Sequence, residues 1–205
     1  MAKIKLTKGE LKKQRDSLKQ FRRYLPTLQL KKQQLQMKIL EARTTLNQKL
    51  SVFYKKEELI GEWVDLLGDS QVDVREWITP RQILVDTINI AGANVPVFNN
   101  IHFDQAQYDI YSTPFWIDTG IGELRLLITY LAEINVIKKQ IETLEYELRI
   151  TTQRVNLFEK VKIPECLNNV RVIRIYLGDQ QANAVGVSKV AKKKIMEKNL
   201  EEVFI

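Results

Sequence analysis

The sequence is poor in the residues that most enzymes use for chemistry. Among its 205 residues there is one cysteine, Cys166, and one histidine, His102. A lone cysteine cannot form a disulfide within the chain, which excludes a disulfide-stapled secreted domain. His102 follows Asn99-Asn100-Ile101, a context typical of a loop or packing histidine. We therefore expect no catalytic triad, no Cys/His pair and no zinc site.

Glycine and proline are also scarce. The chain has 8 Gly and 5 Pro against 28% charged and 44% hydrophobic residues, a balance that favours long helices over a many-stranded fold. Neither the GxxxxGK[ST] nor the GxGxxG pattern is present, so no glycine-rich loop is predicted to hold a nucleotide phosphate. We expect a protein without catalytic residues, cofactor or metal.

Long apolar runs are missing as well. No stretch approaches the roughly 18 uncharged apolar residues that a membrane-spanning helix needs. The opening MAKIKLTKGELKKQR has no apolar core of the kind found in a signal peptide. These features predict a cytoplasmic chain that reaches a membrane only through its partners.

The net charge of +7 is unevenly distributed along the chain. Residues 1–50 hold 14 Lys/Arg and 3 Asp/Glu, a balance of +11. Residues 51–120 hold 4 and 11, a balance of −7, and residues 121–205 hold 14 and 11, a balance of +3. A basic helix can bind nucleic acid, but the chain has no zinc pattern and few aromatic residues among its first basic residues. The preferred interpretation is a helix face that contacts solvent or a protein partner.

Apolar residues recur every seven positions through the first third of the chain. Steps of seven from Leu11 lead to Leu67, and eight of these nine positions are apolar, Lys32 being the exception. This is the pattern of a helix that packs along another helix. The predicted seam residues of this helix are Leu11, Leu18, Leu25, Leu35, Ile39, Leu46 and Phe53.

Pro26 lies inside this pattern, although proline removes a helical hydrogen bond and clashes with the preceding turn. Two interpretations are open: one kinked continuous helix, or two helices broken between Tyr24 and Pro26. The seven-residue phase passes through the proline without slipping, which favours the continuous helix.

A second amphipathic helix is predicted from about Gly122. Its apolar stripe advances by three or four residues from Leu127 to Phe158. The Ile163-Pro164 pair interrupts the pattern and is expected to set a bend, after which helical spacing resumes. Each stripe can leave water by packing on the other, and a partner in the same chain is favoured by effective concentration. The predicted seam residues here are Leu127, Ile134, Ile141, Leu148 and Val155.

Residues 68–120, between the two helices, have a different composition. Gly and Pro punctuate short β-branched runs there, and Ile83–Ile90, followed by AGAN and Val95–Phe98, predicts a short β-hairpin or two short strands. The predicted fold class is mainly α. An N-terminal helix (1–67) and a C-terminal helix with a basic tail (121–205) form a long antiparallel two-helix coiled coil, and the small central segment (68–120) contains the hairpin.

Three stretches resemble the D subunit of the V-type (vacuolar/archaeal-type) ATPases. LTKGEL at residues 6–11, with its Lys/Arg-rich helix, is similar to the start of that family, and AGANVP at 91–96 looks like its central G-x-x-(V/L)-P element. TQRVNLFE at 152–159, followed by an Ile-Pro pair and a terminal Lys cluster, is close to its T-x-R-R-V-N-A-L-E…I-P signature. Gln153 stands where that signature has Arg. The matching motif residues are Arg154, Val155, Asn156, Ile163 and Pro164.

The resemblance implies a non-catalytic rotor shaft in the central stalk of an ion-translocating ATPase or ATP synthase. Such a shaft inserts its termini into a hexamer of catalytic and regulatory nucleotide-binding subunits. It connects through a small central-stalk subunit and a membrane-rotor adaptor subunit to the membrane ring, and so transmits torque as part of a peripheral membrane complex. By family analogy the bore of the hexamer presents acidic loops. The predicted contacts are Lys12, Lys13, Arg15, Lys19, Arg22, Arg23, Lys192, Lys193 and Lys194.

Polar residues beside a coiled-coil seam can fix its register, and this role is predicted for Arg154 and Asn156.

Two other classes of protein share the main features of the sequence. A cytoplasmic coiled-coil scaffold or adaptor would use the same heptads but would pair with itself. A basic rod that binds nucleic acid would do so with steep salt sensitivity. This is the less favoured alternative, and no direct contact with nucleic acid is predicted.

Overall fold

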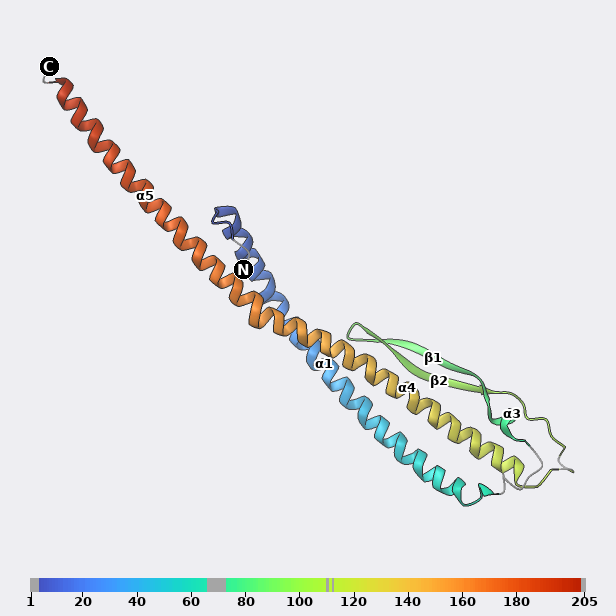
Figure 1. Cartoon of the computed structure of the whole chain (residues 1–205). Coiled ribbons are helices and arrows are strands. Elements are labelled where there is room, and N and C mark those ends of the chain that lie inside the picture. The colour runs from blue at the N-terminus through green and yellow to red at the C-terminus, as the bar shows by residue number, and fades with distance from the viewer. Residues whose placement is uncertain (1–3, 66–72, 110, 112, 204–205) are drawn as a thin grey trace. The chain divides into compact units, whose positions relative to one another are not determined.

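The computed structural model describes residues 4–65, 73–109, 111 and 113–203, with side chains up to residue 197. Its element order is α1 (Lys8–Gly61), α3 (Arg75–Ile78), β1 (Pro80–Ile90), β2 (Ala93–Phe103), α4 (Ile117–Asn156), the π-helix η1 (Leu157–Lys162) and α5 (Ile163–Val203) (Figure 1). The chain divides into two compact units. One comprises Met1–Gln29 with Gln153–Ile205, the other Leu30–Thr152, and each is described by itself.

Helix α1 begins at a side-chain cap and continues through its proline. The Glu10 backbone N–H donates to Thr7 Oγ1 at 3.3 Å, which satisfies one of the free amides of the first turn. Pro26 lies within the 54-residue helix, so the structure has the continuous helix and not a break. Next to the proline, Thr27 Oγ1 donates to the Tyr24 carbonyl at 2.7 Å.

In the unit Leu30–Thr152, α1 and α4 bury a shared apolar seam. Leu35 and Ile39 of α1 form one cluster with Leu144 of α4 and with the start of β2. Ala42 forms a second cluster with Ile137 and Ile141 of α4. Two long helices that pack on each other, with a hairpin between them in the sequence, confirm the predicted fold class.

The twelve predicted seam positions are all at least half-buried. Five are buried: Leu35, Ile39, Ile134, Ile141 and Val155. Seven are half-buried: Leu11, Leu18, Leu25, Leu46, Phe53, Leu127 and Leu148. Ala132 and Val136 of α4 are also buried although they lie off this stripe, so α4 is covered on a second side.

Ion pairs between the two helices all have the same polarity. The base comes from α1 and the acid from α4 in each of four pairs: Lys31–Glu147 at 3.9 Å, Arg43–Glu145 at 2.5 Å, Lys49–Glu133 at 2.9 Å and Lys56–Glu123 at 2.8 Å. Most of these side chains are half-buried, and ion pairs at a protein surface are each worth only about 0–1 kcal/mol. Their order, rising along α1 while broadly falling along α4, matches the antiparallel pairing and disfavours a slipped register.

The hairpin β1–β2 is longer than the sequence predicted, because pairing extends from Ile90↔Ala93 at the turn to Pro80↔Phe103. The two turn residues, Ala91 and Gly92, have φ of +51° and +79°, as a type I′ turn requires. The turn end of β2 packs on the helices, with Ala93 and Val95 buried in the first cluster. The strand β1 carries more of the exposed positions.

The base of the hairpin is held by one arginine of α4. Arg125 donates to the backbone carbonyls of Trp77 at 2.9 Å and Asp104 at 2.6 Å, and its guanidinium lies 5.2 Å from the centre of the Phe103 ring. One side chain therefore ties α3, β2 and α4 together. The predicted boundary at residues 67 and 68 lies outside the described residues.

In the unit Met1–Gln29 with Gln153–Ile205, the C-terminal helical segment changes geometry before its proline. A π-helix covers Leu157–Lys162, where hydrogen bonds span five residues instead of four. The Ile163 N–H bonds to the Phe158 carbonyl, and Pro164 follows in the first turn of α5. The phenyl rings of Phe21 and Phe158 lie 5.1 Å apart, centre to centre, which joins α1 to this segment.

We predict that Leu35→Ala will lower the free energy of unfolding by about 2–5 kcal/mol, because its fully buried side chain would leave a cavity. Leu40→Ala is the matched control, since Leu40 is on the same helix but 68% exposed, and it should change stability by less than about 0.5 kcal/mol. Urea denaturation followed by circular dichroism measures both. Equal effects would mean that the seam is not where the structure places it.

We also predict opposite effects for the same substitution at two glycines. Gly92→Ala should destabilise the chain by about 1–2 kcal/mol, because the alanine would have to adopt a left-handed backbone. Gly178→Ala should stabilise it by about 0.5–1 kcal/mol, because Gly178 is in α5 with no neighbouring atom in the way. Thermal melts of the two variants provide the test, and a stabilising Gly92→Ala would contradict the turn assignment.

Candidate interaction surfaces

The first surface is the basic face of α1. All six predicted contact residues in this helix are exposed: Lys12, Lys13, Arg15, Lys19, Arg22 and Arg23. Apart from Lys13, they follow one another at spacings of three, four, three and one, which keeps them on one side of the helix. Within the described residues, none of the six has an ion-pair partner. Their charges are therefore free to meet an acidic partner.

The second surface is the lysine cluster of α5. Lys192, Lys193 and Lys194 are exposed, and Lys193 is 3.7 Å from Glu197, one turn further on. Figure 1 shows the start of α1 beside the first half of α5, while the rest of α5 continues toward the C-terminus alone. The structure therefore does not bring this cluster together with the basic face of α1.

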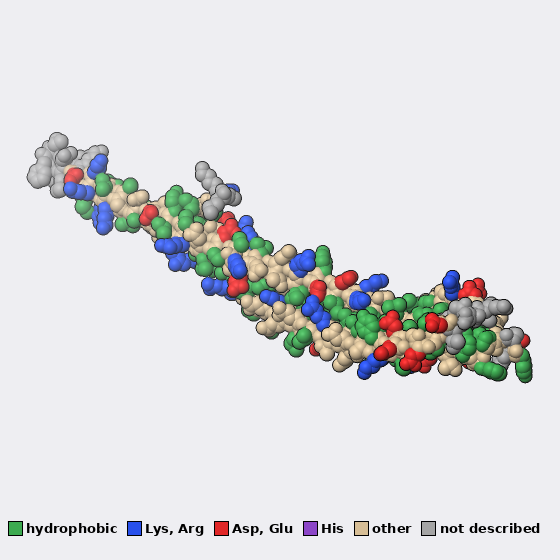
Figure 2. Space-filling view, turned by 60° about the horizontal axis from the view of Figure 1, so that its bottom comes forward, with side chains coloured by type: hydrophobic (Ala, Val, Ile, Leu, Met, Phe, Trp, Pro, Cys, Tyr) green, Lys and Arg blue, Asp and Glu red, His purple; other side chains and the backbone are tan. Residues whose placement is uncertain are grey.

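The third surface is the stretch of α5 from Gly178 to Glu197, which we call the bare stretch. Every side chain in it is exposed, including several large apolar ones: Val185, Val187, Val190, Ile195 and Met196. Figure 2 shows hydrophobic and basic side chains exposed together along this helix. Apolar residues on all sides of a helix are typical of a segment that another protein surrounds.

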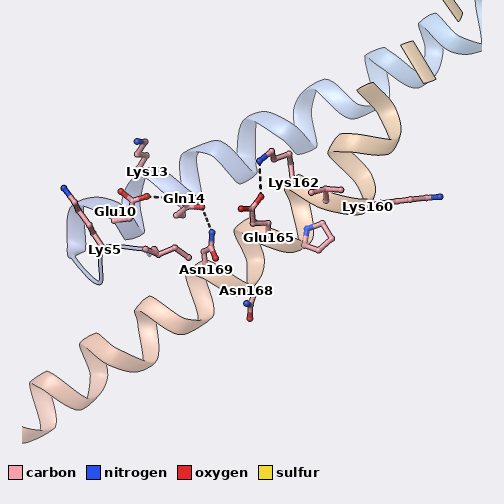
Figure 3. A pocket seen from close by; sticks show the side chains of 12 residues that line it. Lys5, Glu10, Lys13, Gln14, Lys160, Lys162, Glu165, Asn168 and Asn169 are labelled. Carbon is pink, nitrogen blue, oxygen red and sulfur yellow. Dashed lines mark hydrogen bonds and ion pairs between the residues drawn. The ribbon is translucent and has the colours of Figure 1, made fainter. Parts of the chain in front are cut away.

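A cleft of about 1,050 Å³ lies between the start of the chain and η1 with α5. It is lined from one side by Ile4, Lys5, Glu10, Lys13 and Gln14, and from the other by Lys160, Val161, Lys162, Pro164, Glu165, Asn168 and Asn169. In Figure 3, Gln14 and Asn169 point toward each other across it, whereas Lys13 and Lys160 extend outward. Lys162 pairs with Glu165 at 3.1 Å. The lysines therefore do not converge on one point as an anion site would require.

The motif residues around η1 lie in different environments. Val155 is buried and Ile163 is half-buried, whereas Arg154, Asn156 and Pro164 are exposed. The side chains of Arg154 and Asn156 make no hydrogen bond or ion pair with another described residue. Their predicted role in setting the register therefore stays a prediction.

In the part of the chain that the structure describes, no group of His, Cys, Asp and Glu side chains is arranged to hold a metal ion. Among the described helices, none has a stretch that is both apolar and long enough to cross a bilayer. His102 is exposed on β2.

Three features were not predicted from the sequence: two polar side chains that join elements of the fold, and a pair of exposed aromatic residues. Arg125 was not singled out because its role depends on two carbonyls that are far away in the sequence. Asn169 is 7% exposed and bonded across the helices, and a single polar residue inside an apolar stripe was its only signal. Tyr111 and Phe115 are 100% and 95% exposed, and aromatic residues in a loop were their signal.

Cys166 gives a prediction on pH. Burial, followed by the neighbouring Glu165 carboxylate, raises the pKa of this thiol above its ordinary value of 9.0. As pH rises past that value, the unfolded chain loses the proton first, so the stability conferred by the neutral thiol is present below it and lost above it. The native thiol should react at least about tenfold more slowly with a disulfide reagent than the thiol in urea.

Absorbance after addition of the reagent measures the reaction rate of the thiol, and melts between neutral and alkaline pH measure the stability. Cys166→Ala is the control and should lose this part of the alkaline destabilisation. A native thiol that reacts as fast as the unfolded one would contradict its burial.

The comparison with known proteins gives one consistent result. Residues 10–193 match the family model for the D subunit of ATP synthase. The V-type ATP synthase D subunit from Borreliella burgdorferi is 46% identical over 199 residues, which covers 97% of this chain and 98% of the relative. Proteins of the same name from Chlamydia caviae and Chlamydia abortus are 34% and 32% identical over 200 residues, covering 97% of this chain and 96% of each relative. The chain belongs to the D-subunit family of the V-type ATP synthases.

Proposed function

We propose that this chain is the non-catalytic rotor shaft in the central stalk of a V-type ATP synthase. In this role it transmits torque between ATP turnover in the nucleotide-binding hexamer and ion translocation by the membrane ring. The observation that carries the proposal is the bare stretch of α5, with its exposed valines, isoleucine and methionine. In a member of the D-subunit family, the bore of the hexamer is the surrounding protein that would cover it.

A shaft inside a bore must be contacted on several sides in turn. The bare stretch presents apolar and basic side chains without a partner helix, so each subunit around it would meet a different face. Contact that differs between conformations of a subunit shifts the balance between them. The asymmetric helix thus biases each nucleotide site in sequence, without providing a catalytic residue.

The basic face of α1 and the lysine cluster of α5 are the proposed electrostatic contacts with the hexamer. Their side chains are exposed, and acidic loops in the bore would pair with them. Each exposed pair contributes little by itself, so the effect belongs to the set. Such pairs weaken as salt rises, because exposed charges are screened over about 8–10 Å at ordinary ionic strength.

The shaft must also connect to the membrane ring. Tyr111 and Phe115 lie between β2 and α4 with almost fully exposed rings. Aromatic residues are enriched at protein interfaces, so we assign these two to the membrane-rotor adaptor subunit. The small central-stalk subunit is the third proposed partner, and the chain would be cytoplasmic and peripheral to the membrane through the complex.

A homodimeric coiled-coil scaffold is the competing function, since a second copy could also cover the bare stretch. Copy number separates the two functions. Native mass spectrometry of the complex purified gently from its own cells should show one copy with a hexamer of two kinds of nucleotide-binding subunit. A homodimer without the hexamer would reject the shaft, and an adduct with nucleic acid would favour the third class of protein.

Charge reversal tests the proposed contacts with the hexamer. The triple variant Lys12→Glu, Arg15→Glu, Lys19→Glu should bind the hexamer roughly tenfold more weakly, because three attractive pairs become repulsive. Its ATP hydrolysis should also be less tightly coupled to ion transport. The binding deficit of the triple variant relative to the unmodified chain should shrink in high salt.

The matched control reverses three exposed bases of α4, Lys138→Glu, Lys139→Glu and Arg149→Glu. It changes the net charge of the chain equally, but away from the proposed contacts. Binding and coupling measured side by side decide the matter: equal losses in both variants would show that total charge matters and that these residues do not.

A further inference from the structure

The apolar stripe that runs from the end of α4 through η1 into α5 changes the spacing of its residues at η1. Thr151 and Phe158 are seven residues apart, and so are Cys166 and Ile173, and all four are at least half-buried. Between Phe158 and Cys166 the step is eight. In a regular α-helix each residue turns the chain by about 100°, so an eight-residue step would carry the stripe about 80° off the seam.

The π-helix removes this mismatch. Its turns hold more residues than α-turns, and η1, at Leu157–Lys162, overlaps the first part of the eight-residue step. The extra residue is absorbed there, and Cys166, at 5% exposure, and Ile173, at 0%, return to the seam. After η1 comes Ile163, whose N–H bonds to the carbonyl five residues back, and then Pro164.

Beyond η1 a polar contact joins α1 and α5 inside the seam. Asn169 is 7% exposed, and its Nδ2 donates to Gln14 Oε1 at 3.3 Å. Gln14 Nε2 in turn donates to Glu10 Oε1 at 2.8 Å, one turn earlier on α1 (Figure 3). A slip of either helix by one residue or one turn would separate Asn169 from Gln14 and leave its buried amide without this partner, which costs stability.

We propose that η1 and the Gln14–Asn169 pair together set the register of α1 on α5. The π-turn brings the seam of α5 into phase, and the amide pair selects one axial position from those that apolar packing alone would tolerate. Buried polar residues act in this way in coiled coils. Asn169 and Gln14 are thus positioning residues, and they touch no substrate.

The mechanical consequence of this register rests on the proposed function. If α1 could slide on α5, torque applied to one helix would be spent on slipping before it reached the other. The register itself is a property of the isolated full chain. It can therefore fail while the shaft role stands, and the shaft role can fail while the register stands.

Deletion of a single residue tests the role of η1. Deleting Val161 in a Pro164→Ala background changes the eight-residue step to seven, so a regular helix can keep the seam. Its midpoint of thermal unfolding should stay within about 3 °C of the Pro164→Ala parent. Deleting Leu167 in the same background removes a similarly exposed apolar residue (44% against 49%) but breaks the step from Cys166 to Ile173, so it should lower the midpoint much further.

Equal losses from the two deletions would overturn the role of η1. Circular dichroism also reports whether helicity is retained, so a variant that fails to fold is scored as a complete loss of stability. A Leu167 deletion that is harmless while the Val161 deletion is severe would likewise contradict the proposal.

Spin-label distances test the amide pair. Labels at Asp16→Cys and Arg171→Cys, in a Cys166→Ala background, should give one narrow distance in the otherwise unmodified full chain. Gln14→Leu with Asn169→Leu should keep the helicity but broaden or split that distance, because apolar side chains tolerate several registers. One narrow, unchanged distance in the double-leucine variant would show that the pair does not set the register.

Discussion

Burial of one apolar stripe per helix is the constraint on which the rest of the structure depends. Neither long helix can leave water alone, and α1 meets that need with Leu35, Ile39 and Ala42 packed on residues of α4. The hairpin is added to this seam through Ala93 and Val95. Ion pairs and caps then select among arrangements that the seam already permits, since each contributes little.

The same constraint makes the bare stretch of α5 informative. Where α1 no longer lies alongside, the apolar side chains from Val185 to Met196 are not covered by any other described residue. A chain that needed only solubility would place polar residues there. An outside partner would account for them, and in the proposed shaft role that partner is the nucleotide-binding hexamer.

Much of the fold could be predicted because helix periodicity is a local signal. The heptads from Leu11, the hairpin turn at Ala91-Gly92 and the continuity through Pro26 all follow from short-range patterns. Other features could not be predicted, because they depend on distant partners. Arg125 bonds to two carbonyls fixed by tertiary structure, and the burial of Asn169 requires α1 beside it. The one-residue change in spacing at η1 is present in the sequence, but the prediction there was a bend at Ile163-Pro164 and not a π-helix.

Rotation of the chain itself is the most direct test of the account. With the hexamer fixed to a surface and a bead attached through Thr87→Cys, in a Cys166→Ala chain assembled into the complex, addition of ATP should turn the bead in one direction. We expect stepwise rotation that stops when ATP is removed. A bead that stays fixed while the same complexes hydrolyse ATP would contradict the shaft role.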